Sequence, residues 1–394
     1  MKMGHPIRLH HDMTPYCWAD VPEEKYKNFM SIKGARKDSQ TYSAVGMPYL
    51  LQIEPTNICN LSCPLCPAGR NELGRDRRHM SLAEFQRLVD DIAQWLLLLV
   101  MWNWGEPFIN PDLPAMIRYA AEHDIKTVTS TNAHFLNNPD YVESILTAGL
   151  STLIVAIDSV SCDSYNVYRK GGELDRVLAG IEGLVAAKKR LGSDTCINFR
   201  MVVMRQNEHE VSALRTLART MGADRFTLKT LNPSCGLASL DGDLLPHNPR
   251  YRRYRYKPGT YERIRKDGPC NRIWSIANIH SNGDVVPCCY DYDASLKVGN
   301  VFEEPLSRLW NGPAYRALRE RICRNRESIQ RCHECWINYE LSDSGWFVES
   351  TALQGGDLRG RLRDILRRTV YRGGVRRIGN AMRRKVGMLH RSAV

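Results

Sequence analysis

Short apolar runs alternate with longer segments of helical periodicity from residue 48 to residue 231. Strands that are apolar throughout and separated by single helices are typical of a parallel sheet whose outer face is covered by helices. The pattern predicts six successive β–α units, which suit a partial (β/α)6 TIM-like barrel or a doubly wound sheet. The expected strands are Pro48–Pro55, Leu97–Trp104, Lys126–Ala133, Thr152–Ser159, Thr195–Met204 and Asp224–Leu231.

The segments between these runs carry apolar residues at helical spacing. The clearest helix begins at Ser81, where Ser81-Leu82-Ala83-Glu84 forms a capping box. In both architectures ligands gather at the C-terminal ends of the strands, so polar or thiol groups just after a strand are the first candidates for function. The other expected helices cover residues 112–123, 139–148, 173–190 and 208–221.

The chain outside these units has a different pattern. Residues 232–267 are rich in Pro, Gly, Tyr and Arg without a sustained period, and residues 358–370 place apolar residues at helical spacing among arginines. We expect an α/β fold, a partial barrel followed by a small α+β module. The predicted domains are a polar N-terminal extension (1–47), the (β/α)6 core (48–232), a basic Tyr- and Arg-rich connection (233–267), a cysteine-bearing module (268–345) and a basic C-terminal tail (346–394).

Composition excludes disordered and fibrous chains, because 43% of the 394 residues are hydrophobic. The formal net charge of +12 is concentrated at one end, since residues 359–394 contain twelve Lys and Arg against one acid, Asp364. The rest of the chain is nearly neutral, so nucleic acid is not its expected partner. The tail is open to three interpretations: a solvated extension, an RNA-binding segment or an anchor at a membrane surface.

Thirteen cysteines would indicate a disulfide framework in a short secreted chain, but this chain is long and shows no export signal at its start. Its longest apolar run, Trp95–Trp102, is less than half of a membrane span. We expect a cytoplasmic protein, peripheral to a membrane if the tail binds one. In a reducing compartment the cysteines are thiols, and clustered thiols indicate metal binding or catalysis.

The first cysteine cluster, Cys59, Cys63 and Cys66, directly follows the first expected strand with C-x3-C-x2-C spacing. Three thiolates within eight residues can hold three irons of a [4Fe–4S] cube and leave the fourth iron open. A structural zinc site needs four ligands, usually in paired C-x2-C hairpins, which this spacing does not provide. The other alternative is three unrelated core cysteines.

With these residues the sequence resembles the radical S-adenosylmethionine (SAM) superfamily, from about Pro48 to Leu231. The resemblance implies that SAM chelates the open iron and that the reduced cluster cleaves SAM to a 5′-deoxyadenosyl radical, which abstracts a substrate hydrogen. It also implies an electron donor such as flavodoxin or ferredoxin. One residue departs from the family pattern: Leu65 stands before the third cysteine, where an aromatic residue is usual.

The second strand ends in Asn103-Trp104-Gly105-Glu106-Pro107, which resembles the family's Gly-Gly-Glu-Pro segment with Trp104 in place of the first glycine. The resemblance implies that Glu106 and the backbone around Gly105 receive the SAM ammonium through a charge-assisted contact. Read alone, Gly-Glu-Pro is a turn after a strand.

Further strand-end residues are similar to the family's other SAM ligands. Ser130 and Asn132 after the third strand, and Asp158 after the fourth, are the candidates for the ribose. Arg200 on the fifth strand is the candidate for the SAM carboxylate, because a guanidinium grips a carboxylate bidentately. The alternative for each is a helix cap or a turn former.

A second cysteine set contains two pairs of thiols separated by a long insertion. The motif C-x12-G-x4-C and the later C-x2-C resemble the SPASM/Twitch auxiliary-cluster module, and the shorter Twitch form with one auxiliary [4Fe–4S] cluster fits best, because no cysteine follows the last one. On spacing alone a zinc ribbon is equally possible. The proposed ligands are Cys270, Cys288, Cys332 and Cys335.

The leading functional hypothesis is a radical SAM oxidoreductase that oxidises or epimerises a small polar biosynthetic intermediate, such as a sugar or an aminocyclitol. An auxiliary cluster would accept the second electron of an oxidation, whereas Cys235, just past the last strand, would return a hydrogen atom in an epimerisation. Cys235 is otherwise an ordinary loop thiol.

Two other functions remain open. One is maturation of a ribosomally made peptide, although the segment before the first strand is shorter than an autonomous peptide-recognition domain of roughly eighty residues. The other is an RNA-modifying or RNA-binding protein that uses the basic tail.

Overall fold

The computed structural model describes residues 5–38, 40–232, 243–266, 268–333 and 335–353, and its centre is a ten-stranded sheet. Six strands run parallel in chain order and form the partial barrel that the sequence predicts. Each lies inside its expected range. They are β3 (Leu50–Ile53), β4 (Leu98–Met101), β5 (Lys126–Thr131), β6 (Thr152–Ala156), β7 (Cys196–Val203) and β8 (Arg225–Thr230).

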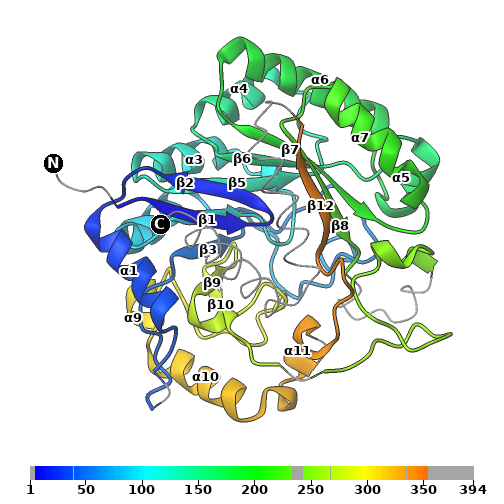
Figure 1. Cartoon of the computed structure of the whole chain (residues 1–394). Helices are drawn as coiled ribbons and strands as arrows, with labels where there is room; N and C mark the ends of the chain where they lie inside the picture. The colour runs from blue at the N-terminus through cyan, green and yellow to red at the C-terminus, as the bar shows by residue number, and fades with distance from the viewer. Residues whose placement is uncertain (1–4, 39, 233–242, 267, 334, 354–394) are drawn as a thin grey trace, which may run out of the picture.

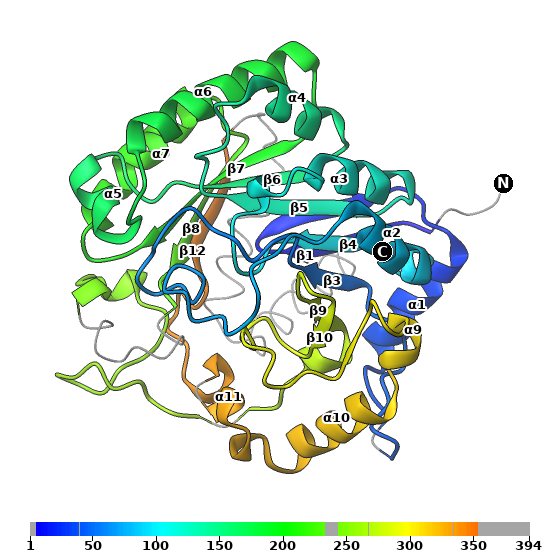
Figure 2. The ribbon, with the colours of Figure 1, turned by 180° about the vertical axis from the view of Figure 1, so that it is seen from behind.

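Five helices cover the outer face of this sheet, and four of the expected helices match them closely (Figures 1 and 2). The expected helix 208–221 divides into a short 3-10 turn (Glu208–Glu210) and an α-helix. The Ser81–Glu84 capping box is confirmed, with reciprocal hydrogen bonds. The five are α2 (Leu82–Ile92), α3 (Leu113–Glu122), α4 (Pro139–Thr147), α6 (Leu174–Leu191) and α7 (Val211–Thr220); the short α5 (Cys162–Tyr168) was not expected.

Alternate residues of the parallel strands face two different layers. Leu51 and Leu99 belong to the main core beneath the helices, whereas their neighbours Leu50 and Leu98 face the inside of the barrel. This alternation matters for function because inward-facing side chains near the strand ends point toward the ligand side of a barrel.

The N-terminal segment is more than the polar extension that we expected. It forms an antiparallel hairpin, β1 (Ile7–His11) and β2 (Thr14–Trp18), followed by α1 (Glu23–Gly34). The hairpin lies in front of β3 to β5 in Figure 1 and behind them in Figure 2. Its apolar residues alternate with polar ones, and they cover the inward-facing residues of the barrel strands.

Later segments extend the barrel sheet at both edges. β9 (Ile276–Ile279) pairs parallel with β3, and β10 (Asp284–Val286) and β11 (Gly299–Asn300) continue this edge. At the other edge β12 (Phe347–Ala352) pairs antiparallel with β8. The expected tail boundary at residue 346 was therefore wrong, because it assigns a strand of the core sheet to the tail.

The cysteine-bearing module also contains three helices, α9 (Leu306–Leu309), α10 (Pro313–Asn325) and α11 (Gln330–His333), which lie below the barrel in Figure 1. In the connection, isolated bridges join Tyr254 to Leu341 and Arg265 to Tyr339. Cys235 and residues 354–394 of the basic tail lie outside the described residues. Within the described residues, none of the helices combines the length and apolar character needed to cross a membrane.

Candidate functional site

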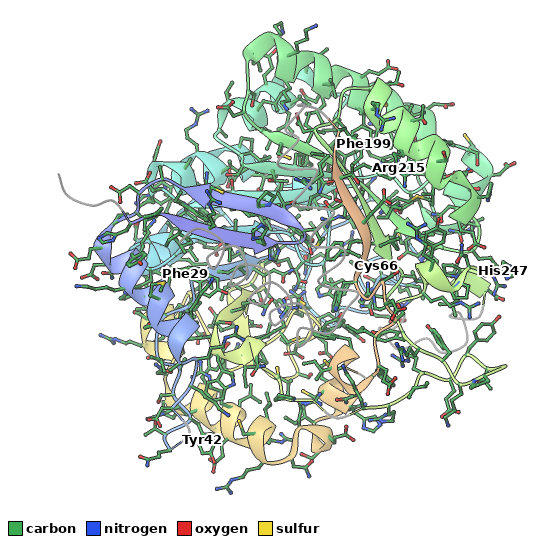
Figure 3. The ribbon with its side chains drawn as sticks, viewed as in Figure 1. Phe29, Tyr42, Cys66, Phe199, Arg215 and His247 are labelled. Atoms are coloured by element: carbon green, nitrogen blue, oxygen red, sulfur yellow. The ribbon has the colours of Figure 1, made fainter. Side chains whose placement is uncertain are left out.

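The loop after β3 carries Cys59, Cys63 and Cys66 as free thiols, and the charges of Cys63 and Cys66 act on the Cys59 thiol. Cys63 is buried and the other two are half-buried, and Figure 3 labels Cys66 near the centre of the molecule. The loop is tightly folded: the Cys66 N–H donates to the Cys63 carbonyl at 3.1 Å. A Cβ on Gly69 would lie 2.6 Å from the Cys63 nitrogen, so only glycine fits there.

The surroundings of these thiols fit an iron–sulfur cluster. Burial raises the pKa of Cys59 to about 12 and also raises the pKa values of Cys63 and Cys66, so without a metal the three thiols keep their protons. Backbone N–H groups nevertheless point at the sulfurs: Leu61 N lies 3.4 Å from Cys59 Sγ. Such donors stabilise a metal-bound thiolate, as cluster ligation requires.

The predicted Gly105–Glu106 turn packs directly on the cysteine loop. Gly105 has φ +107°, and a Cβ there would lie 2.4 Å from the Thr56 carbonyl oxygen. The Glu106 N–H donates to the Ile58 carbonyl at 2.8 Å, one residue before Cys59. The carboxylate of Glu106 is therefore fixed beside the cysteine loop, as the sequence resemblance implies.

Glu106 also connects the second and third strand ends. Its Oε2 accepts a hydrogen bond from the Asn132 backbone N–H at 2.7 Å, and the Asn132 side-chain amide donates to Asn60 Oδ1 at 2.8 Å. Burial raises the pKa of Glu106 to about 7. Ser130 is half-buried on the inward face of β5, two residues earlier. The predicted residues Gly105, Glu106 and Asn132 thus meet at the cysteine loop.

Asp158 serves mainly to hold an arginine that the sequence reasoning missed. Its Oδ2 accepts from Arg169 Nε at 2.7 Å and pairs with Nη2 at 2.6 Å, and its Oδ1 accepts from the Val202 N–H. Arg169 also interacts with the Cys63 thiol and lowers its pKa in opposition to burial. A half-buried guanidinium therefore lies at the first cysteine cluster.

Arg200 has a different partner from the one expected. It lies on the inward face of β7, and its Nη1 donates to Oδ2 of Asp12 in the β1–β2 turn at 2.7 Å. The Asp12 carboxylate also lies 3.7 Å from Lys229 Nζ on β8. Of the two arginines, Arg169 is thus the one whose charge acts on a cysteine of the first cluster.

The second cysteine set also converges in the structure. Charge interactions couple Cys332 to Cys335 and to Cys270, and Cys288 to Cys335. Burial raises the pKa of Cys332 to about 12, while the pKa of Cys288 is raised by a hydrogen bond with Cys289 and by burial. Four half-buried thiols that act on one another are a suitable ligand set for an iron–sulfur cluster.

The glycine of the second motif has a clear structural role. Gly283 forms the tight turn between β9 and β10 with φ +84°, and a Cβ would lie 2.5 Å from Asn300 Oδ1. Nearby, Trp310 Nε1 donates to the Gly46 carbonyl, and the Asn311 amide makes two hydrogen bonds with the Ala44 backbone. The module is thereby attached to the segment before β3.

A buried ion pair joins the two cysteine-bearing regions. Arg75, in the loop after the first cluster, pairs with both carboxylate oxygens of Glu54 at 2.8 and 3.0 Å. The same guanidinium donates from Nε to the Tyr292 carbonyl, four residues after Cys288. The Trp104 ring packs edge-on against the Tyr292 ring, with centroids 5.9 Å apart. Trp104 therefore makes a contact to the second module that a glycine would not make.

Sequence reasoning missed Arg169, Asp12 and Lys229. The Arg-Lys-Gly-Gly run at residues 169–172 was a usable signal, because paired glycines often place a neighbouring side chain close to a ligand. Asp12 and Lys229 lacked any local signal, since their meeting depends on the hairpin entering the barrel.

Comparison with known families agrees with this geometry. Residues 53–218 match the radical SAM superfamily, and residues 270–336 match SPASM, an iron–sulfur cluster-binding domain. The two matches contain all seven cysteines that the sequence selects as ligands. They favour iron–sulfur over a zinc ribbon in the second module.

Individual known proteins resemble the chain more distantly. The AdoMet-dependent heme synthase of Methanosarcina barkeri is 25% identical over 310 residues, which are 69% of this chain and 85% of that protein. A PqqA peptide cyclase of Granulibacter bethesdensis is 28% identical over 304 residues, 70% of this chain and 78% of the relative.

Among solved structures, SuiB of Streptococcus suis bound to S-adenosylmethionine has a TM-score of 0.53 and 18% identity, over 82% of this chain and 76% of SuiB. At this identity the likeness concerns the fold, and it agrees with a partial barrel followed by a C-terminal module. A [4Fe–4S] cluster with SAM, and further iron–sulfur ligation in the second module, follow from the two domains. The chain thus contains a radical SAM domain, followed by a C-terminal iron–sulfur cluster-binding domain of the SPASM type.

Proposed function

We propose that this radical SAM enzyme is an oxidoreductase that removes two electrons and two protons from a small polar molecule, at a carbon next to oxygen or nitrogen. The observation that supports the proposal is the direct contact between the two cysteine-bearing regions through Arg75, Tyr292 and Trp104. Bound SAM and the clusters supply a 5′-deoxyadenosyl radical that takes one hydrogen atom and an acceptor for the second electron. The substrate then releases a proton, and the product is two hydrogen atoms lighter.

The residues of the first region have separate roles in this proposal. Cys59, Cys63 and Cys66 hold the first cluster, and the Glu106 carboxylate receives the SAM ammonium. Asn132, whose backbone N–H donates to the Glu106 carboxylate, lies beside these residues and binds the ribose of SAM. Arg169 takes the SAM carboxylate in place of Arg200, because Arg169 is the arginine whose charge acts on Cys63.

The residues of the second module hold the acceptor of the second electron close to the substrate. Cys270, Cys288, Cys332 and Cys335 bind one auxiliary cluster. The Arg272 guanidinium compensates part of the negative charge of this cluster, since the thiols of Cys288 and Cys289 act on this guanidinium. An electron donor such as flavodoxin or ferredoxin transfers the first electron to the first cluster.

Maturation of a peptide is the second candidate, and the similarity to PqqA peptide cyclases over 70% of this chain favours it. The N-terminal segment, which enters the barrel as a hairpin, does not provide a separate peptide-recognition domain among the described residues.

The two candidates differ in the product that forms. Reconstituted full-length protein is incubated anaerobically with SAM, dithionite and either a library of sugars and aminocyclitols or a library of precursor peptides. Mass spectrometry then searches for a SAM-dependent product that is two hydrogens lighter. Such a product from the first library supports the proposal; products from peptides alone would replace it with the second candidate.

Cys235 distinguishes oxidation from epimerisation. If a thiol returns hydrogen to the substrate radical, the product has the same mass as the substrate and acquires deuterium from D2O. A Cys235→Ala variant that forms product at the wild-type rate would remove the epimerase hypothesis.

A further inference from the structure

The turn of the β1–β2 hairpin lies at the functional end of the barrel. His11, the last residue of β1, packs edge-on against the ring of Trp102, which directly follows β4, with centroids 6.4 Å apart. The apolar hairpin residues below it pack against the inward-facing side chains of the barrel strands. The hairpin therefore closes the barrel from below and carries its turn up to the strand ends.

The two turn residues adopt a backbone conformation that costs free energy. Asp12 has φ +49° and Met13 has φ +63°, between the paired residues His11 and Thr14. Two-residue hairpin turns of this kind strongly favour Asn-Gly or Asp-Gly, because most side chains disfavour positive φ. A methionine at the second position is costly, and non-glycine residues in such conformations concentrate at functional sites.

Asp12 holds two cations from neighbouring strands. Its carboxylate contacts Arg200 Nη1 at 2.7 Å and Lys229 Nζ at 3.7 Å. The side chains of Asp12 and Lys229 each keep 19% of their surface exposed, and Met13 is 41% exposed. These residues border open space, although the hairpin that carries two of them is packed into the barrel.

The positive charge in this group exceeds the negative charge. The charged side chains that act on Lys229 are Asp12, Arg200 and Arg253, together with the Cys289 thiol. The Asp12 carboxylate thus faces two cations, Arg200 and Lys229, and Arg253 adds a third positive charge near Lys229. In addition, Arg200 Nε and Nη2 are buried without a hydrogen-bond partner among the described residues, which is costly for a guanidinium. Both observations indicate that an anion binds here, accepts hydrogen bonds from Arg200 and balances the positive charge.

We propose that Arg200, Lys229 and Asp12 form a subsite that binds an anionic group of the substrate, either a carboxylate or a phosphate. The inference deepens the proposed function and rests on it, because the substrate of the barrel has to lie at these strand ends. Arg200 and Lys229 attract the anion, whereas Asp12 holds both cations in position and weakens the binding by its own charge. Asp12 and Lys229 are therefore predicted to affect anion affinity in opposite directions.

Calorimetric titration of the reconstituted full-length protein with inorganic phosphate, and separately with acetate, tests the subsite. Lys229→Met should weaken the binding of the anion by about tenfold, while Lys229→Arg, which keeps the charge, should restore most of the affinity. Asp12→Asn, which keeps the shape of the side chain, should tighten binding about fivefold, because a competing charge is removed. Lys27→Met, at an exposed ion pair on α1, is the matched control and should change nothing.

Iron content and melting temperature of each variant verify that the fold is intact. The proposal is overturned if neither anion binds the wild-type protein, if Asp12→Asn and Lys229→Met shift affinity in the same direction, or if saturating SAM displaces the anion. Displacement by SAM would assign Arg200 to the SAM carboxylate instead. Preferential binding of phosphate or acetate identifies the anionic group.

Formation of 5′-deoxyadenosine by the same preparation checks the proposed function separately. Protein that cleaves SAM without binding either anion refutes only the subsite. Protein that binds an anion without cleaving SAM refutes the proposed chemistry and supports the subsite as a binding site.

Discussion

The surroundings of the Glu106 carboxylate favour binding of a cation. It is buried, and its two oxygens accept hydrogen bonds from the Phe108 and Asn132 backbone N–H groups. Burial nevertheless raises its pKa to about 7, because two amide donors do not replace the lost water. The positive charge of a bound ammonium would offset this loss of hydration and stabilise the ionised carboxylate.

The pKa of Glu106 predicts how SAM affinity varies with pH. Below pH 7 the unbound carboxyl is increasingly protonated, so SAM must displace a proton to bind. Between about pH 5.5 and 7 the SAM ammonium stays protonated, and affinity should fall as pH decreases, approaching about tenfold per unit at the lower end of this range. Equilibrium dialysis with labelled SAM measures this slope. Glu106→Gln should bind SAM weakly with no slope; an unchanged slope in this variant would assign the titration to another group.

Gly105 is a second residue at which local geometry decides function. Gly105→Ala would place a methyl group 2.4 Å from the Thr56 carbonyl oxygen at φ +107°, which requires the strand-end turn to move away from the cysteine loop. We expect loss of SAM binding and a lower melting temperature. Gly183→Ala is the matched control: this exposed glycine of α6 has nothing within 4 Å of an added Cβ, so the change should stabilise by about 0.5–1 kcal/mol. Equal effects of the two substitutions would contradict this reasoning.

At the scale of elements, the attachment of the second module to the barrel depends on a buried ion pair. The Arg75 and Glu54 side chains are 4% and 0% exposed, and the Ser281 N–H also donates to the Glu54 carboxylate. Arg75 reaches the Tyr292 carbonyl from the same position. The loop of the first cluster and the second module therefore share one polar contact.

Glu54→Gln should destabilise the protein by about 3–5 kcal/mol, because it leaves a buried guanidinium without its countercharge. Chemical unfolding monitored by tryptophan fluorescence measures the change. Glu23→Gln, which breaks the exposed pair with Lys27, should leave stability unchanged. A small effect of Glu54→Gln would mean that water reaches the pair and that the module is held mainly by Trp310 and Asn311.

The elements differ in how far the sequence predicts them. The six barrel strands and the Ser81 helix start are encoded locally, by runs of apolar residues and a capping box, and they were predicted within a few residues. The β1–β2 hairpin also alternates in the sequence, but its polar, His-rich face concealed the pattern. β12 could not be assigned, because only its pairing with the distant β8 makes it a strand.

At the scale of the whole molecule, the site residues also differ in whether the local sequence predicts them or only distant contacts define them. The cysteines proposed as ligands and the Gly105–Glu106 turn are short motifs, and in the structure the thiols within each cysteine set act on one another. In the Asp12–Arg200–Lys229 group, Asp12 lies 188 positions before Arg200 and farther still before Lys229, and no spacing rule reveals that they meet. Asp12 and Lys229, which sequence reasoning missed, are accordingly joined by tertiary packing alone, whereas Arg169 had a local signal in the Arg-Lys-Gly-Gly run.

Iron content tests the division into two cluster regions. Anaerobically reconstituted protein should contain about eight irons per chain. A triple Cys59/Cys63/Cys66→Ala variant should retain about four, and a Cys270/Cys288/Cys332/Cys335→Ala variant should also retain about four. About four irons and one zinc in the wild-type protein would contradict the auxiliary cluster and restore the zinc alternative for the second module.

The most direct test of the central claim is the amount of 5′-deoxyadenosine formed when the anaerobically reconstituted full chain is mixed with SAM and dithionite. The proposed chemistry predicts that the wild-type protein forms it and that a single Cys63→Ala substitution abolishes it, while Cys323→Ala, at an exposed cysteine outside both sets, does not. No 5′-deoxyadenosine from iron-loaded wild-type protein, or undiminished formation by the Cys63→Ala variant, would contradict the account.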